Sequence, residues 1–178
     1  MSAAAGARTG GRAGPMGILS HMELDAGQQL ELLIRLAVAV GLTALVGIER
    51  ELKQEQAGLR THALVGLGAA AFTVISTLGF PLGDGDPTRV AAGIVTGIGF
   101  IGAGTILRNG GGVRGLSTAA SLWAVGAIGM AAGAGLFVFA VGTTLLALFV
   151  LEVLERLERA FLRGRLAGHR PADGSPPL

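Results

Sequence analysis

Long apolar runs separated by short polar connections dominate the middle of the chain. Three runs, at 32–48, 63–80 and 90–107, each approach the roughly 20 residues that a helix needs to cross a bilayer. A fourth uncharged stretch, 116–151, is too long for one straight helix across a hydrocarbon core about 30 Å thick, so it must turn back. The pattern therefore predicts an all-α membrane protein with about five transmembrane helices.

The best turning point in the fourth stretch is Gly133-Ala134-Gly135. A turn there divides the stretch into helices at about 117–132 and 136–153. Ser117 or Thr118 is expected to cap the first of these helices. A bent or re-entrant segment is the alternative, because each half is short for a full span.

The first apolar run contains one charge, Arg35, which follows Glu31 by one helical turn. The two side chains can pair, and the arginine can reach the membrane interface. A buried functional arginine is the alternative. Ala39, Thr43 and Gly47 recur every four residues and predict a ridge of small residues on which a neighbouring helix lies.

Basic residues are concentrated in alternate connections. The connections 49–60 and 108–115 and the tail after the last helix carry arginines, whereas 81–88 contains aspartates and no basic residue. Short cytoplasmic connections carry an excess of Lys and Arg, so the N terminus is predicted outside the cell and the C terminus inside. The tail at 152–165 is predicted to be amphipathic and to lie along the cytoplasmic surface, with disorder after it.

Composition agrees with a single small membrane domain, because the 178 residues are 51% hydrophobic and only 15% charged. The expected organisation is a flexible leader at 1–27, a transmembrane domain at 28–155 and a cytoplasmic tail at 156–178. A net charge of only +2 argues against a broad nucleic-acid-binding face. The absence of cysteine excludes disulfides and thiolate metal sites.

The glycine-rich stretch 97–104 lies inside an apolar run and is not followed by a lysine, which excludes a phosphate-cradling loop. No nucleophile, base and oxyanion donor converge in any segment, so neither an enzyme nor a cofactor is predicted. Small residues in this run are expected to pack against neighbouring helices, as is Trp123 in the next run. The expected packing glycines are Gly93, Gly97, Gly102 and Gly104.

Polar residues of the predicted cytoplasmic end form the candidate functional surface, the polar cap. Acidic residues at the end of the first helix are expected to pair there with arginines before the fourth, because a lone charge at that depth is costly. The alternatives are a solvated helix end, a positive-inside anchor and, for the histidine, an interfacial polar residue instead of a metal ligand or proton relay. The cap comprises Glu49, Arg50, Glu51, Arg60, His62, Arg108, Asn109 and Arg114.

A separate candidate for cation binding lies in the second connection. Asp84 and Asp86 offer hard oxygen ligands of the kind that Mg²⁺ prefers, although D-G-D-P is also ordinary turn chemistry.

Four blocks of the chain resemble the signature of the MgtC/SapB family of bacterial inner-membrane proteins. They are GIERE at 47–51, AGLRTH at 57–62, GIGFIGAG at 97–104 and GLSTAASLW at 115–123. The resemblance, which runs from about residue 32 to 153, implies a five-helix domain with the N terminus outside. Many members continue into a cytoplasmic domain after the last helix, and this chain is expected to be a short form without it.

The family resemblance also implies a function. Members are linked to growth in low magnesium and to stress or virulence adaptation, and the best-known one is thought to restrain the membrane-embedded ATP synthase. A regulatory protein that binds other membrane proteins and lipid, with a homo-oligomer also compatible, is therefore expected. The alternative is a transporter or channel for Mg²⁺ or another cation. Such a path needs polar sites at membrane depth, and three of the five predicted helices have no ionisable residue in their centres.

Overall fold

The computed structural model describes residues 24–78, 86–109, 112–157 and 160. Its helices are α2 (Ala26–Leu52), α3 (Leu59–Leu78), α4 (Pro87–Gly104), α5 (Leu116–Gly133) and α6 (Phe137–Phe149), and α6 passes into a π-helical turn, η1 (Val150–Leu154). A two-stranded antiparallel hairpin of β1 (Leu107–Asn109) and β2 (Gly112–Arg114) connects α4 to α5.

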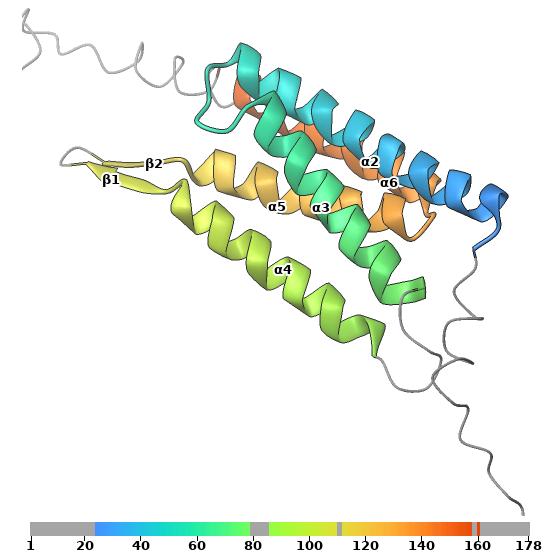
Figure 1. The fold of residues 1–178 in the computed structure, drawn as a ribbon. Helices are drawn as coiled ribbons and strands as arrows, with labels where there is room; N and C mark the ends of the chain where they lie inside the picture. Colours follow the sequence, from blue (N-terminus) through green and yellow to red (C-terminus); the bar gives the residue numbers. More distant parts are fainter. Residues whose placement is uncertain (1–23, 79–85, 110–111, 158–159, 161–178) are drawn as a thin grey trace, which may run out of the picture.

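Successive helices run in alternating directions along the bundle (Figure 1). Four are long and apolar enough to cross a membrane, including the continuous helix Phe137–Leu157, and α4 is apolar but shorter. The prediction of an all-α membrane bundle of about five helices is confirmed. The hairpin was not predicted, and the third helix ends at Gly104 instead of reaching Leu107, because Leu107 already pairs with Arg114 in the hairpin.

Helix α5 lies at the centre and packs against α2, α3, α4 and α6 (Figure 1). Glycines let α3 approach it closely. A Cβ added to Gly133 would lie 2.6 Å from the carbonyl oxygen of Ala70, which leaves no room for a side chain. By contrast, Trp123 is 57% exposed and lines an apolar groove with residues that include Val95 of α4 and Phe139 of α6, so it is not buried in the core as a packing aromatic would be.

The predicted small-residue ridge on α2 is confirmed. Ala39, Thr43 and Gly47 are all buried. A Cβ on Gly47 would lie 2.7 Å from Cα of Leu59, and one on Gly66 would collide with Thr43. The ridge therefore sets how closely α2 and α3 pack.

The predicted turn between α5 and α6 is also confirmed. Gly135 adopts a left-handed conformation (φ 79°), and the N–H groups of Gly135 and Leu136 donate to the carbonyls of Ala132 and Ala131 at 3.0 and 2.8 Å. This is a Schellman motif, which needs glycine at the left-handed position. Two complete helices therefore replace the re-entrant alternative.

The charge pair expected at the start of the first helix is present. Arg35 pairs with Glu31, and its Nη1 also donates to the carbonyl oxygen of Gly133 at 3.2 Å. Arg35 thus satisfies a free carbonyl at the end of α5 and ties that end to α2.

Helix starts differ in part from expectation. Asp25 and Gln28 form a capping box for α2, which begins at Ala26, so the last two residues of the predicted leader are helical. Helix α5 begins after Gly115, which has a left-handed conformation (φ 89°) and no side-chain cap. The predicted cap by Ser117 or Thr118 is therefore wrong. The hydroxyls of both residues, which lie inside the first turn, contact side chains from the α2 end instead. The predicted disordered tail lies outside the described residues.

Candidate functional site

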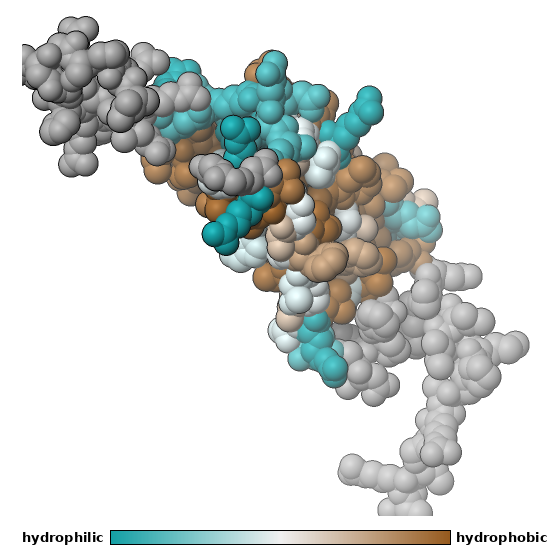
Figure 2. Space-filling view, turned by 90° about the vertical axis from the view of Figure 1, so that its left-hand side faces the viewer, coloured by the Kyte–Doolittle hydropathy of each residue, from teal (hydrophilic) through white to brown (hydrophobic). Residues whose placement is uncertain are grey.

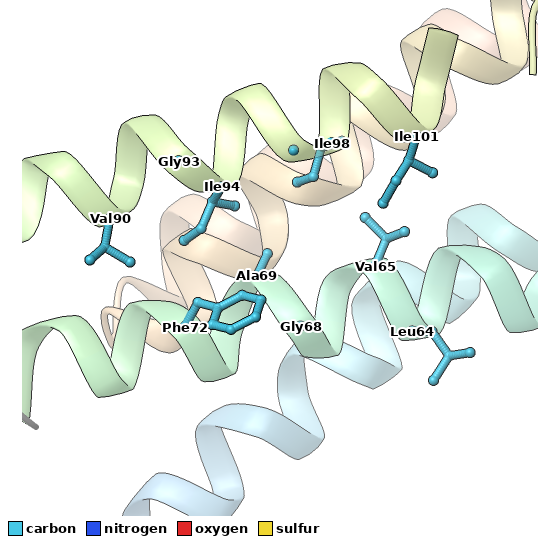
Figure 3. Close-up of a pocket in the computed structure, with 11 residues that line it drawn as sticks. Leu64, Val65, Gly68, Ala69, Phe72, Val90, Gly93, Ile94, Ile98 and Ile101 are labelled. Atoms are coloured by element: carbon cyan, nitrogen blue, oxygen red, sulfur yellow. The ribbon is translucent and has the colours of Figure 1, made fainter. Parts of the chain in front are cut away.

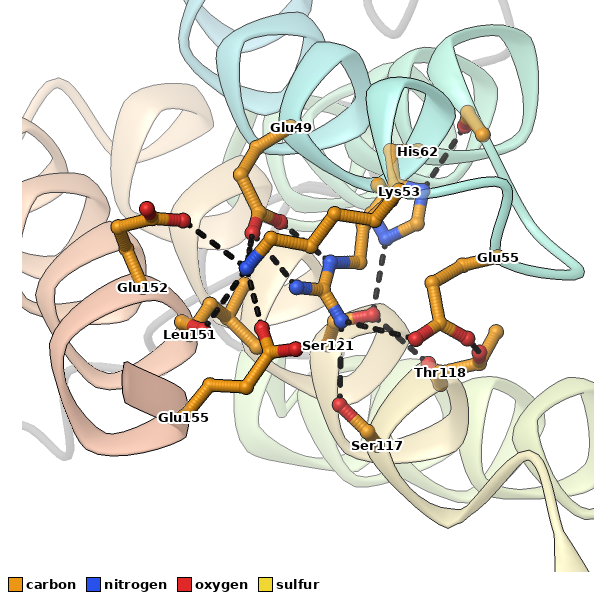
Figure 4. A network of polar contacts seen from close by, with 12 residues as sticks. Glu49, Lys53, Glu55, His62, Ser117, Thr118, Ser121, Leu151, Glu152 and Glu155 are labelled. Carbon is orange, nitrogen blue, oxygen red and sulfur yellow. Dashed lines mark hydrogen bonds and ion pairs between the residues drawn. The ribbon is translucent and has the colours of Figure 1, made fainter. Parts of the chain in front are cut away.

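One end of the bundle contains a network of charged and hydroxyl side chains that includes Glu49, Glu55 and Ser117 (Figure 4). All three contact Arg50, which is 2% exposed. The guanidinium Nη2 donates to Oε1 of Glu49 at 2.7 Å and Nη1 donates to Oγ of Ser117 at 3.1 Å. Nη1 also lies 3.6 Å from Oε1 of Glu55. A buried guanidinium is tolerated only when it is paired in this way. Arg50 therefore joins α2, the turn after it and the start of α5.

Lys53 extends the network to the last helix. Its Nζ lies 2.7 Å from Glu49 and 2.9 Å from Glu152, forms an ion pair with Glu155 and donates to the carbonyl oxygen of Leu151 at 3.3 Å. The last three partners lie in or beside η1, where π-helical geometry alters the usual hydrogen bonding. Partial burial by itself lowers the pKa of Lys53, but hydrogen bonds with Glu155, Glu49 and Glu152 raise it above its ordinary value.

His62 forms the inner side of the network and is fully buried. Its Nδ1 lies 2.9 Å from the carbonyl oxygen of Gly58, and its Nε2 lies 3.0 Å from Oγ of Ser121. The Thr118 hydroxyl donates to Oε2 of Glu55 at 3.1 Å, which connects this region to Arg50. Among the described residues, no buried side-chain nitrogen or oxygen lacks a hydrogen-bond partner.

The local sequence explains how the chain reverses between α2 and α3. Gln54 adopts a left-handed conformation (φ 57°), and the N–H of Glu55 donates to the carbonyl of Arg50 at 3.0 Å. Glu51 accepts a 2.9 Å hydrogen bond from the N–H of Leu59, and its carboxylate occupies the space that a Cβ at Gly58 would need. The acidic residue therefore stabilises the start of α3.

Three residues of the predicted polar cap, Glu49, Arg50 and His62, take part in this network, and Glu51 lies beside it. Sequence reasoning missed several other members. The i,i+4 spacing of Glu49 and Lys53 could have predicted their ion pair. Nothing in the local sequence could have predicted the partners from α5 and the last helix. The missed residues are Lys53, Glu55, Ser117, Thr118, Ser121, Glu152 and Glu155.

The expected pairing of helix-one acids with arginines of the hairpin is not observed. Arg60, Arg108 and Arg114 are exposed, and none of them forms an ion pair with another described residue. Asn109 lies in β1 and pairs with Gly112 in the ladder. The hairpin projects from the bundle (Figure 1), and the acidic residues are instead paired with Arg50 and Lys53.

Hydrophilic residues gather at this end, and hydrophobic residues cover much of the flanks in the same view (Figure 2). The arrangement is that of a bundle whose sides face lipid and whose end faces water.

Of the two aspartates predicted as metal ligands, the structure describes Asp86. Asp86 caps α4, accepting hydrogen bonds from the N–H and hydroxyl of Thr88 at 2.9 and 2.6 Å. These two hydrogen bonds lower the pKa of Asp86. Asp84 lies outside the described residues. Within the described ranges, no group of three or more His, Asp or Glu side chains is arranged to hold a metal ion.

The predicted packing glycines of α4 divide into two groups. A Cβ on Gly102 would lie 3.4 Å from the carbonyl oxygen and 3.6 Å from Cβ of Ala119 of α5, which agrees with packing. A Cβ on Gly93, Gly97 or Gly104 would meet nothing within 4 Å. The prediction that these three glycines pack against other helices of the chain is therefore wrong, because α4 contacts its neighbours through Ile94 and Ile98.

A groove of about 570 Å³ lies between α3 and α4 (Figure 3). Its lining is almost wholly apolar, and glycines on both helices hollow it. The residues that line it include Leu64, Gly68, Phe72, Val90, Gly93, Ile94, Gly97 and Ile101.

Comparison with known proteins identifies the family. The model of the MgtC family matches residues 36–160, which is most of the chain. The chain belongs to the MgtC family. This confirms the family expected from the four sequence blocks.

Several proteins of this family are close in sequence. The putative magnesium transporter YhiD of Escherichia coli K12 is 42% identical over 134 residues, covering 71% of this chain and 62% of that protein. Protein MgtC of Brucella abortus is 50% identical over 122 residues, covering 68% and 50%. Protein MgtC of Salmonella typhimurium is 48% identical over 116 residues, covering 65% and 49%. The MgtC-family region shared with this chain thus spans about half to three fifths of these relatives. No solved structure matches the chain.

Proposed function

We propose that this MgtC-family membrane protein is regulatory, carries out no catalysis and acts by binding other membrane proteins. The observation that carries the proposal is the outward face of α4. A Cβ added to Gly93 or Gly97, which are one helical turn apart, would meet nothing within 4 Å, and both glycines line the apolar groove between α3 and α4. In lipid, small residues favour helix association because they let two backbones approach closely.

The proposed location is the bacterial inner membrane, with the N terminus outside and the C terminus in the cytoplasm. The end of α2, the hairpin and the end of the last helix lie at the same end of the bundle (Figure 1). Basic residues there include Lys53, Arg60, Arg108, Arg114 and Arg156. An excess of Lys and Arg favours the cytoplasmic side.

The family resemblance points to the membrane-embedded ATP synthase as a partner. A transmembrane helix from that assembly is a suitable occupant of the α3–α4 groove, since the groove offers apolar side chains and glycine backbone but no charged group. The polar network is a less suitable docking surface, because its charges are already paired within the chain.

Cation transport is the alternative, favoured by the name of the YhiD relative, putative magnesium transporter. The carboxylates of Glu49, Glu152 and Glu155 are the oxygen ligands that such a path would use. Each of them is held by Lys53, and Glu49 also by Arg50, so a cation would have to displace the protein's own ammonium and guanidinium groups. This cost supports the regulatory function over transport.

The test uses a photo-crosslinking amino acid at Gly97 in native membranes, with the same group at Val138 as a control. Val138 is 90% exposed but lies on α6, away from the groove. Crosslinks to ATP synthase subunits from position 97 but not from 138 are expected. Crosslinks to a second copy would instead identify a homo-oligomer and contradict the proposed partner.

A second measurement separates the two functions. Purified protein in liposomes should produce no more Mg²⁺ entry than protein-free liposomes. Robust Mg²⁺ flux with protein alone would overturn the regulatory function as the primary one.

A further inference from the structure

The hydrogen bonds around His62 constrain where its protons lie. The carbonyl oxygen of Gly58, 2.9 Å from Nδ1, can only accept a hydrogen bond, so Nδ1 carries a proton. The other ring nitrogen, Nε2, lies 3.0 Å from Oγ of Ser121. That same oxygen lies 2.8 Å from the carbonyl oxygen of Thr118, which also can only accept. Ser121 therefore has two neighbouring acceptors whenever the histidine is neutral.

The number of hydrogens distinguishes the two charge states. When His62 is neutral, Nε2 is an acceptor and needs the single hydroxyl hydrogen of Ser121. No hydrogen is then left between the Ser121 oxygen and the carbonyl oxygen of Thr118. A protonated His62 donates from Nε2 to Ser121, and the Ser121 hydroxyl then donates to Thr118. Only the protonated form satisfies all three short contacts at once.

We propose that His62 and Ser121 form a proton-binding site inside the helix bundle, and that proton uptake at Nε2 turns the Ser121 hydroxyl from His62 to Thr118. The uptake requires no movement of a heavy atom, because both acceptors already lie within hydrogen-bond distance of Ser121. The ligand is the proton itself. The proposal does not depend on the partner or on whether an ion is transported.

The charged groups around His62 come chiefly from α2 and the turn that follows it. Burial of the ring is the strongest opposition to a positive charge on His62, and the hydrogen bond to the Gly58 carbonyl favours that charge. Arg50 opposes the charge as well, and Glu49 favours it. Glu55 pairs with Arg50 and accepts from Thr118. The α5 residue that contacts His62 is Ser121, which carries a hydroxyl and no charge. In the last helix, the charged side chains of Glu152 and Glu155 form ion pairs with Lys53. The only charged residue of α4, Arg89, lies in its first turn at the opposite end (Figure 1). The anionic side chains around Arg50 thus offset its charge.

The direct experiment is ¹⁵N NMR of histidine-labelled protein in lipid nanodiscs over a pH series, with the His62→Gln variant used to assign the resonances. Nδ1 should be protonated throughout, and Nε2 should gain a proton as the pH falls while the protein remains folded. A neutral form protonated at Nε2 instead of Nδ1 would overturn the proposal. So would an Nε2 that stays unprotonated down to the lowest pH at which the fold persists.

The role of Ser121 is tested by Ser121→Ala, which removes the acceptor of the charged N–H. Proton affinity at His62 should fall about tenfold, because a hydrogen bond to a charged group is stronger than one between neutral groups. Ser117→Ala removes a hydroxyl that lies one helical turn earlier and contacts Arg50. This control variant should leave the midpoint of the His62 titration unchanged. If Ser121→Ala does not fold, Ser121→Cys keeps a weaker acceptor and should lower the affinity less. An unchanged midpoint in the folded Ser121 variant would contradict the proposal.

Discussion

Substitution of glycine by alanine is expected to have opposite effects at two positions of this bundle, Gly129 and Gly97. A Cβ at Gly129 in α5 would lie 3.0 Å from Cβ of Ala69 and 3.0 Å from Cα of Gly66, and closer still to the Gly66 carbonyl oxygen. Carbon atoms in contact prefer about 3.5–4.0 Å, so α3 and α5 would have to separate by roughly 0.5–1 Å. Overpacking of this kind costs about 1–3 kcal/mol. Gly129→Ala should therefore destabilise the protein by that amount.

Gly97→Ala is the matched variant on α4. Its new Cβ meets nothing within 4 Å, and alanine favours a helix over glycine by about 0.5–1 kcal/mol. The variant should be as stable as the parent or slightly more stable. Unfolding by SDS in mixed micelles, followed by circular dichroism, gives the free energy of each variant. A loss at Gly97 as large as that at Gly129 would refute the assignment of an open face to α4.

Three further predictions follow from the polar end and the turns. A double-mutant cycle of Lys53→Met and Glu155→Gln should give a coupling energy of about 0.5–2 kcal/mol in the same SDS assay, and a value near zero would contradict the observed ion pair. Asp86 should stabilise the start of α4 at pH values above the pKa it has in the unfolded chain, and this effect should be lost as the pH falls through its lowered pKa in the folded protein. Hydrogen exchange at the start of α4 should therefore depend on pH, and Asp86→Asn should remove that dependence. Single cysteines at Val113 and Leu136, introduced into a chain that has none, should be labelled from opposite sides of the membrane, with Val113 on the cytoplasmic side.

The number of helices and their approximate positions were predictable because each is written in a continuous stretch of sequence. Apolar runs of membrane-spanning length, the Gly133–Gly135 turn and the i,i+4 ridge from Ala39 to Gly47 are all local signals. Their physical causes act over one to five turns of helix. The structure confirms each of them.

The contacts between distant segments were not predictable in the same way. Lys53 and Glu155 are separated by 102 positions, and nothing in either local sequence specifies that they meet. The face of α4 that packs was also ambiguous, because glycines occur on several sides of that helix and only Gly102 meets α5. Ser117 has the residue type of a helix cap but bonds to Arg50, since tertiary contact outweighed local preference.

The last helix and α4 differ in how they are held in the bundle, and this difference bears on where a partner can bind. Movement of the last helix away from α2 would break the ion pairs of Lys53 with Glu152 and Glu155, which costs free energy. Helix α4, by contrast, rests on α3 and α5 through a narrow apolar stripe that includes Ile94 and Ile98, and it makes no ion pair with another described residue. If α4 shifts within lipid, acyl chains or another helix can largely replace the apolar packing of this stripe. The α4 edge is therefore where a partner helix can dock at the lowest cost to the rest of the bundle.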